Sequence, residues 1–216
     1  MFNVSFKLPP DVLATETVQK RIRRVQRGPS QVIAETLGAY RSEFQPGDWI
    51  LELASGEGRN LTMFKDWGCE LHGIEIDGTA IEMCNQLLQH TGTAAQILQG
   101  SFTDLSAFPD QSFRLVYTQS SIQNAQTITD VELVFSEARR VLKPGGLFLL
   151  RESSMPRHLD AGRQRRVAYF TEEELHGLVR RHGFAFMSGD KPEDIGPDDR
   201  RVGGRKVVWT AVLRKQ

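Results

Sequence analysis

The chain has no excess of charge, no long apolar run and almost no cysteine. Its 27 Lys and Arg residues equal its 27 Asp and Glu residues in number, so no global charge draws it to nucleic acid or to anionic lipid. No apolar run approaches the ~20 residues that span a membrane. Residues 1–10 lack the apolar core of a secretory signal. We therefore expect neither a membrane span nor a secreted protein.

The low cysteine content also indicates that the protein is not secreted. Cys69 and Cys84 are the 2 cysteines, and neither belongs to a C-x-x-C or another metal-ligand spacing. We therefore predict no metal site and a reduced, cytoplasmic environment. With 216 residues, the chain is long enough to bury one sizeable core.

What the chain does have is a glycine loop between an apolar run and a helix-like segment. Residues 50–53 form the run, the loop is Ala54-Ser55-Gly56-Glu57-Gly58, and the helix-like pattern begins at Asn60. Glycine has no Cβ, so Gly56 and Gly58 permit a tight bend and let backbone N–H groups lie against a ligand. The loop would lie at the carboxyl end of a strand, where open α/β sheets bind their ligands.

The spacing of the loop discriminates between two cofactor classes. The dinucleotide fingerprint G-x-G-x-x-G, begun at Gly56, requires a small residue where this chain has Leu61. The alternative is E-x-A-x-G-x-G, from Glu52 to Gly58. This pattern resembles the first motif of the class I S-adenosylmethionine (SAM)-dependent methyltransferases, with Ala54 in place of the first glycine. Alanine tolerates a positive φ poorly, which predicts a slightly altered loop. A plain strand–turn–helix connection remains the alternative.

A second apolar run, from residue 69 onward, ends in the acids Glu75 and Asp77. A carboxylate some twenty residues past a glycine loop can accept both hydroxyls of a ribose, and Glu75 has that position. It also matches the acidic residue of the family pattern G-hydrophobic-D/E. Asp77 is the alternative, although N-capping of the next helix is its simpler role.

Three later segments resemble the same family. Residues 95–99 read as a third strand, after which Ser101 replaces the family's adenine-contacting Asp and Phe102 could flank the adenine. Phe113-Arg114 replaces the usual Phe-Asp before strand four. Residues 141–150 resemble the family's turn into strand five, in which Pro144 would stop a helix.

The resemblance implies that the cofactor is SAM and its product S-adenosylhomocysteine (SAH). It also implies the set of residues that would bind them: Glu52, Ala54, Ser55, Gly56, Gly58, Asn60, Glu75, Ile76, Ser101, Phe102 and Gln119.

Helix and strand patterns alternate after residue 47, which predicts βαβ units and a parallel sheet. Capping boxes at Thr129-x-x-Glu132 and Thr171-x-x-Glu174 predict two helix starts. Residues 206–213 predict a final strand, which the family inserts antiparallel, and residues 189–204 an exposed loop. The expected fold is α/β, a doubly wound, seven-stranded, mostly parallel sheet with an antiparallel last strand, plus N-terminal helices.

The first 47 residues predict two helices, 15–27 and 30–44, separated at Gly28-Pro29. We expect them to form a helical cap over a methyltransferase domain at 48–216. In the family such a pair covers the cofactor and touches the acceptor, and a packing appendage is the alternative. The basic runs 20–27 and 163–166 are either solvated helix faces or sites for an anionic acceptor or RNA. No aromatic residues interleave with them, which disfavours stacking on single strands.

Methyl transfer from a sulfonium is an in-line displacement, so the protein mainly positions the acceptor and excludes water. The family places the end of strand four, here residues 117–124, over the methyl group. This segment has no Asn-Pro-Pro-Tyr-like motif for planar nitrogens and no Pro-Cys nucleophile. These absences favour a small-molecule acceptor. RNA methylation and a non-catalytic, SAM-binding regulatory module are the alternatives.

A general base is needed only if the acceptor must lose a proton. Candidates by residue type and position are Tyr117, Glu152, His158 and Tyr169. The sequence assigns the role to none of them.

Overall fold

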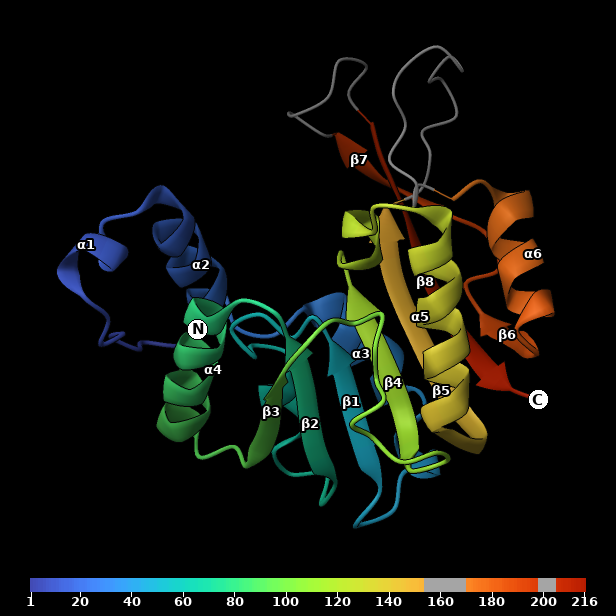
Figure 1. The fold of residues 1–216 in the computed structure, drawn as a ribbon, viewed down its shortest axis with the longest axis horizontal. Coiled ribbons are helices and arrows are strands. Elements are labelled where there is room, and N and C mark those ends of the chain that lie inside the picture. Colours follow the sequence, from blue (N-terminus) through green and yellow to red (C-terminus); the bar gives the residue numbers. More distant parts are fainter. Residues whose placement is uncertain (154–169, 198–204) are drawn as a thin grey trace. The chain divides into compact units, whose positions relative to one another are not determined.

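The computed structural model describes residues 1–153, 170–197 and 205–216. The chain forms two compact units, Met1–Ser101 and Phe102–Gln216, which are described separately (Figure 1). The boundary after residue 47 between a helical cap and a methyltransferase domain stays a prediction. His158 and Tyr169, and the basic run 163–166, lie outside the described residues.

The first unit contains a parallel three-stranded arrangement in the order β3-β2-β1. β1 is buried along nearly its whole length, as expected for a parallel strand covered on both faces. The carboxyl ends of β1 and β2 lie side by side, because Leu53 pairs with Ile74. The elements of this unit are α1 (Pro10–Leu13), α2 (Glu16–Gln26), α3 (Gln31–Gly38), η1 (Arg41–Glu43), β1 (Trp49–Leu53), η2 (Leu61–Phe64), β2 (Glu70–Glu75), α4 (Gly78–Thr91) and β3 (Ala95–Gln99).

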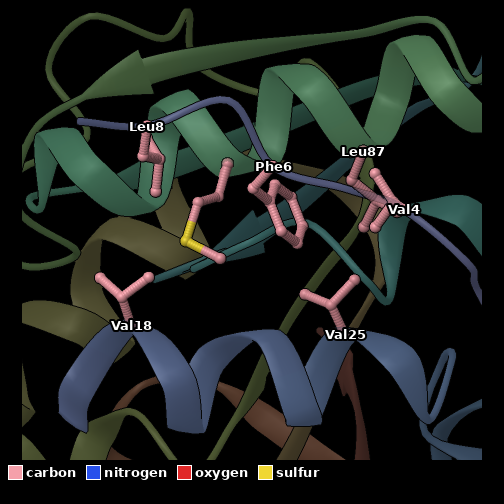
Figure 2. Packing of buried hydrophobic residues seen from close by; sticks show 7 residues of the cluster. Val4, Phe6, Leu8, Val18, Val25 and Leu87 are labelled. Carbon is pink, nitrogen blue, oxygen red and sulfur yellow. The ribbon is translucent and has the colours of Figure 1, made fainter. Parts of the chain in front are cut away.

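The N-terminal helices form where predicted, although the second is shorter. α2 begins after Thr15, whose side chain accepts a hydrogen bond from the Val18 N–H, and α3 ends at Gly38 instead of near residue 44. Figure 2 shows Val18 and Val25 on the side of α2 that faces the cluster, with Val25 pointing toward the side chain of Phe6. One buried apolar cluster joins the N-terminal segment, α2 and α4: Val4, Phe6, Leu8, Val18, Val25, Met83 and Leu87.

The prediction of a regular helix from Asn60 is wrong. Only a 3₁₀ helix, η2 (Leu61–Phe64), follows the glycine loop. The Thr62 hydroxyl donates to the Arg59 carbonyl oxygen at 2.7 Å, and such local bonds compete with regular helix formation. Gly68, at φ +73°, then turns the chain toward β2.

The second unit contains the strand order β4-β5-β8-β6, with β7 also paired to β8. β5 is parallel to β4 and antiparallel to β8, which confirms the antiparallel insertion of the last strand. α5 packs on β5 and α6 on β6. The elements of this unit are β4 (Phe113–Gln119), η3 (Ile122–Asn124), α5 (Ile128–Val141), β5 (Leu142–Ser153), α6 (Glu172–Arg181), β6 (Phe184–Ser188), β7 (Glu193–Pro197) and β8 (Arg205–Lys215).

The α/β class and the mostly parallel pairing with antiparallel C-terminal strands are confirmed. The described residues contain eight strands instead of seven. The extra strand is β7, which lies in the segment expected to be a loop and pairs antiparallel with residues 205–208 of β8.

Of three sequence signals for the ends of helices, two mark other residues than the structure shows and one is confirmed. The cap of α5 is Thr127 with Asp130, not Thr129 with Glu132, because the helix begins two residues earlier. The box at Thr171 is confirmed. α5 also ends at Val141, before Pro144, and β5 starts directly after it. Over the part of the chain that the structure describes, no helix is both long and apolar enough to cross a bilayer.

Candidate cofactor-binding site

The glycine loop of the first unit follows β1 and adopts left-handed backbone conformations at alternate residues. Ala54 has φ +50°, Gly56 φ +54° and Gly58 φ +71°. The Ser55 N–H donates to the Ile74 carbonyl oxygen at 3.0 Å, so the loop is attached to the end of β2. The alternation of small residues in the sequence thus corresponds to an alternation of backbone conformation.

The two glycines have different surroundings. A Cβ on Gly56 would meet no atom within 4 Å, whereas a Cβ on Gly58 would lie 2.3 Å from Cys84 Sγ of α4. Gly58 is therefore required for packing of the loop on α4, and Gly56 leaves space beside the loop. Gly73 of β2 is also tightly packed, because a Cβ there would lie 2.7 Å from Ser55 Oγ.

Glu75 ends β2, and its carboxylate receives backbone N–H groups from both sides. Oε2 accepts from Gly56 N at 2.8 Å, and Oε1 accepts from Ile76 N and Asp77 N, both at 2.9 Å. The residue is 9% exposed. A carboxylate has about four acceptor positions, so it retains acceptor capacity for a ligand. The next side chain, Ile76, is 71% exposed and presents an apolar surface beside it.

Asp77 caps the N-terminus of α4, which is the simpler role that the sequence indicated for it. Its Oδ1 accepts from Ala80 N at 3.0 Å, at the start of α4. Its two carboxylate oxygens also accept from Arg21 of α2, at 3.2 and 2.8 Å. This hydrogen-bonded guanidinium, with the backbone bond from Ala80, lowers the pKa of Asp77 to about 2.

Glu52 and Asn60 support the loop from inside. Asn60 Nδ2 donates to Glu52 Oε1 at 2.9 Å, and Asn60 Oδ1 accepts from Ser30 N at 2.9 Å. Both side chains are buried. Arg59 donates to the Gly28 carbonyl oxygen at 2.8 Å, so the linker between α2 and α3 is bound to the end of the glycine loop.

In the second unit, a buried carboxylate organises the turn that follows β4. Glu152 of β5 is fully buried. Its oxygens accept from the Thr118 hydroxyl at 3.1 Å, from Ser121 N at 2.9 Å and from Gln123 N at 3.4 Å. Ser120 takes a left-handed φ of +57° at the turn. Burial outweighs these hydrogen bonds and raises the pKa of Glu152 to about 7 from its ordinary 4.5.

This raised pKa predicts a pH-dependent stability. Between about pH 4.5 and 7, the folded chain retains a proton that the unfolded chain has released, so the free energy of unfolding falls as pH rises through this window. Glu152→Gln does not titrate and should lose this decline, on the order of 2 kcal/mol. Urea unfolding across the window measures it, with the exposed Glu173→Gln as control. An unchanged pH profile in Glu152→Gln would contradict the assignment.

The remaining sequence-predicted residues occupy varied places. Ser101 follows β3 at the end of the first unit, and Phe102 begins the second; both are half-buried. Gln119 ends β4, and Tyr117 in the same strand is fully buried. Among the described residues, no group of three or more His, Cys, Asp or Glu side chains is arranged to hold a metal ion.

Comparison with known families identifies the protein family to which the segment with this glycine loop belongs. Residues 51–150 match the family model described as "Methyltransferase domain". This part of the chain belongs to the class I, SAM-dependent methyltransferase family. The methyltransferase domain so matched begins within β1 and ends within β5. It therefore includes the glycine loop, Glu75 and the turn after β4.

Curated relatives of this methyltransferase domain include several sterol methyltransferases. The sterol 24-C-methyltransferase of Schizosaccharomyces pombe is 31% identical over 147 residues, which cover 62% of this chain and 36% of the relative. Methyltransferase phqN of Penicillium fellutanum is 29% identical over 185 residues, covering 81% of this chain and 55% of the relative. The chain spans less than two fifths of the length of the sterol methyltransferases that it matches.

Solved structures share the methyltransferase fold at low identity. A SAM-dependent methyltransferase of Methanosarcina mazei superposes with a TM-score of 0.67 at 21% identity, covering 82% of this chain and 96% of that one. Phosphoethanolamine N-methyltransferase 2 of Haemonchus contortus, solved with phosphomonomethylethanolamine and SAH, gives 0.71 at 13% identity, covering 95% and 58%.

The residues of the first unit are compatible with the adenosine half of SAM. Gly56 provides space beside the loop, Glu75 retains acceptor capacity for a hydroxyl beside its three N–H donors, and Ile76 offers an exposed apolar surface for a ring. Ala54, the departure from the family motif, takes the left-handed conformation of a glycine. The slight alteration of the loop expected from this substitution stays a prediction.

Ala54→Gly should stabilise the methyltransferase domain. A left-handed conformation costs an alanine ~1–2 kcal/mol, and the extra chain entropy of glycine offsets ~0.5–1 kcal/mol of the relief. We expect a net gain of up to about 1 kcal/mol in the free energy of unfolding, measured in urea. Ala39→Gly is the control, because Ala39 has an ordinary φ of −63° and glycine should not stabilise there. Destabilisation by Ala54→Gly would indicate that alanine is not strained in this loop.

One feature of the site was missed by sequence reasoning. Arg21 of α2 contacts Asp77 and also Glu57, a residue of the glycine loop, with Nε 3.1 Å from Glu57 Oε1. Arg24 lies 3.6 Å from the same carboxylate. The solvated-face interpretation of residues 20–27 holds for the exposed Arg23 and is wrong for Arg21. The sequence feature that could have indicated these contacts is an arginine within the apolar stripe of α2.

Proposed function

We propose that the protein transfers a methyl group from SAM to a small-molecule acceptor. The observation that carries the proposal is the carboxylate of Glu75, held by N–H groups of the glycine loop and of its own strand end, next to the open side of Gly56. Membership of residues 51–150 in a SAM-dependent family supports it.

SAM, when bound, supplies a methyl group that its positive sulfur already activates. The protein then needs to hold the cofactor, orient the acceptor and exclude water. In this proposal Glu75 accepts a hydrogen bond from the ribose, Ile76 contacts the adenine, and the N–H groups around Gly56 lie along the cofactor. Ser101, Phe102 and Gln119 complete the proposed set, together with Glu52, Ala54, Ser55, Gly58 and Asn60 as loop residues.

The acceptor is proposed to be a small molecule. Relatives named for sterols and for phosphoethanolamine favour this class, as does the lack of a planar-nitrogen motif in residues 117–124. Tyr117, His158 and Tyr169 stay proposals for a base, and the carboxylate of Glu152 is hydrogen-bonded to the turn after β4. We also propose a cytoplasmic location, supported by the free thiols of Cys69 and Cys84.

Calorimetry decides the cofactor. The protein should bind SAM and SAH and should not bind NAD. Transfer of a labelled methyl group from SAM to a panel of sterols, phosphoethanolamine and other amines and alcohols then tests catalysis. Tight NAD binding without SAM binding would overturn the proposal, and SAM binding without transfer to any acceptor would favour the regulatory module.

Arg21 also bears on the RNA alternative. Arg21 forms ion pairs with Glu57 and Asp77. This part of the first basic run is therefore not available to bind phosphates. We expect only weak binding of mixed cellular RNA at physiological salt, measured by filter binding across a salt series. Submicromolar affinity with a steep salt dependence would favour RNA as the substrate, because each neutralised phosphate releases counterions.

A further inference from the structure

Arg21 lies on the buried face of α2. In a helix, residues three and four apart share a face, so Arg21 belongs to the stripe of Val18, Ile22 and Val25. Val18 and Val25 are buried in the apolar cluster with Met83 and Leu87 (Figure 2). The Arg21 side chain is only 17% exposed. An arginine is almost never placed on such a face unless it is paired, so its partners are the reason for its position.

The partners of Arg21 are two carboxylates from different parts of the cofactor-binding edge. Its Nη1 and Nη2 bind the two oxygens of Asp77 at 3.2 and 2.8 Å. Its Nε lies 3.1 Å from Oε1 of Glu57, whose side chain is 3% exposed. One planar guanidinium thus joins the glycine loop to the start of α4, a geometry that lysine cannot reproduce.

Both partners are directly connected to the positioning of Glu75. The Asp77 N–H donates to Glu75 Oε1, and Gly56, the neighbour of Glu57, donates its N–H to Glu75 Oε2. Arg21 therefore holds the side chain of one donor residue and the chain neighbour of the other. Together with the Ile76 N–H, which also donates to Oε1, these two donors set the direction of the Glu75 oxygens.

The charges around Arg21 give a second reason to expect that it holds this edge in place. Glu57, Glu75 and Asp77 bring three carboxylates to one edge, and Arg21 is the best-buried cation that contacts two of them. Without it, the nearly buried Glu57 would retain Arg24, whose side chain is 56% exposed and lies 3.6 Å away. A buried carboxylate that loses its ion-pair partner is strongly destabilised, and Gly56 is the chain neighbour of this carboxylate.

We propose that Arg21 is a positioning residue for the cofactor: through Glu57 and Asp77 it fixes the backbone donors that orient the Glu75 carboxylate toward the ribose. The proposal rests on the proposed function, since it assigns the SAM ribose to Glu75. It makes helix α2 part of the machinery for cofactor selectivity, through the contacts of Arg21 with Glu57 and Asp77.

The test measures ribose recognition. Calorimetry compares SAH with its 2′-deoxyribose analogue for the wild-type protein and for Arg21→Gln. The wild type should prefer SAH by at least tenfold, since the analogue lacks one hydroxyl bonded to a charged acceptor. In Arg21→Gln the affinity for SAH should fall at least tenfold and the preference should shrink to less than threefold. Arg23→Gln, an exposed change on the same helix, should alter neither value.

Two further variants keep the test decisive. Asp77→Asn breaks half of the network while leaving an oxygen to cap α4, and should reduce the preference in the same direction if Arg21→Gln folds poorly. Arg21→Lys should restore only part of it. An equal loss of affinity for both ligands in Arg21→Gln or Asp77→Asn, or no loss, would overturn the role of Arg21. Failure of the wild type to bind SAH at all would instead overturn the proposed function.

Discussion

Replacing Glu75 by alanine should weaken the binding of SAH by about 10- to 100-fold, because a hydrogen bond to a charged acceptor contributes ~1.5–3 kcal/mol. The loss includes an indirect part: the N–H groups of Gly56, Ile76 and Asp77 would lose their shared acceptor. Calorimetry with SAH measures the affinity, and circular dichroism checks that the variant is folded.

Two controls define the result. Glu70→Ala removes an exposed carboxylate at the other end of β2 and should leave the affinity unchanged. Asp77→Ala should weaken binding much less than Glu75→Ala, because the Asp77 carboxylate is already engaged by Arg21 and by Ala80 N. A larger effect of Asp77→Ala would show that the ribose had been assigned to the wrong acid.

Gly58→Ala should destabilise the fold by roughly 2–5 kcal/mol, which combines overpacking with a left-handed backbone conformation. The added Cβ would lie 2.3 Å from Cys84 Sγ, at a backbone φ of +71°. Gly56→Ala is the matched control in the same loop, since its φ is also positive but its Cβ would meet no atom within 4 Å. It should lose only the conformational part, about 1–2 kcal/mol.

A second substitution separates the two contributions. Cys84→Ala removes the sulfur that the new methyl group would strike, so Gly58→Ala should be milder in that background than in the wild type. The free energies of unfolding in urea give the coupling between the two sites. Equal losses for Gly58→Ala and Gly56→Ala, or additive effects of Gly58→Ala and Cys84→Ala, would show that contact with Cys84 is unimportant.

The positions of the glycine loop and of Glu75 could be predicted because they depend on short spacings within single strand ends. The left-handed conformation of Ala54 was harder to foresee, since the local preference of alanine opposes it and only the attachment of the loop to β2 imposes it. The cap of α5 was misplaced by two residues because Thr127 and Thr129 both precede acids at capping-box spacing.

Long-range contacts explain the rest. The role of Arg21 depends on α2 lying against α4 and the glycine loop, which no local pattern specifies. Glu152 is separated by 34 residues from Thr118, so its place beneath the turn after β4 follows only from strand pairing. β7 lies in a segment rich in Pro, Gly and Asp, and it forms because β8 offers it an unpaired edge.

The arginine within the apolar stripe of α2 also determines where that helix can lie along its neighbour. Val18, Ile22 and Val25 recur almost every turn, so their contacts alone would tolerate a slip of one helical turn, about 5.4 Å. Such a slip would carry the guanidinium of Arg21 away from both carboxylates. Because an unpaired charge in apolar surroundings is strongly disfavoured, these ion pairs favour the observed position of α2 over a slipped one.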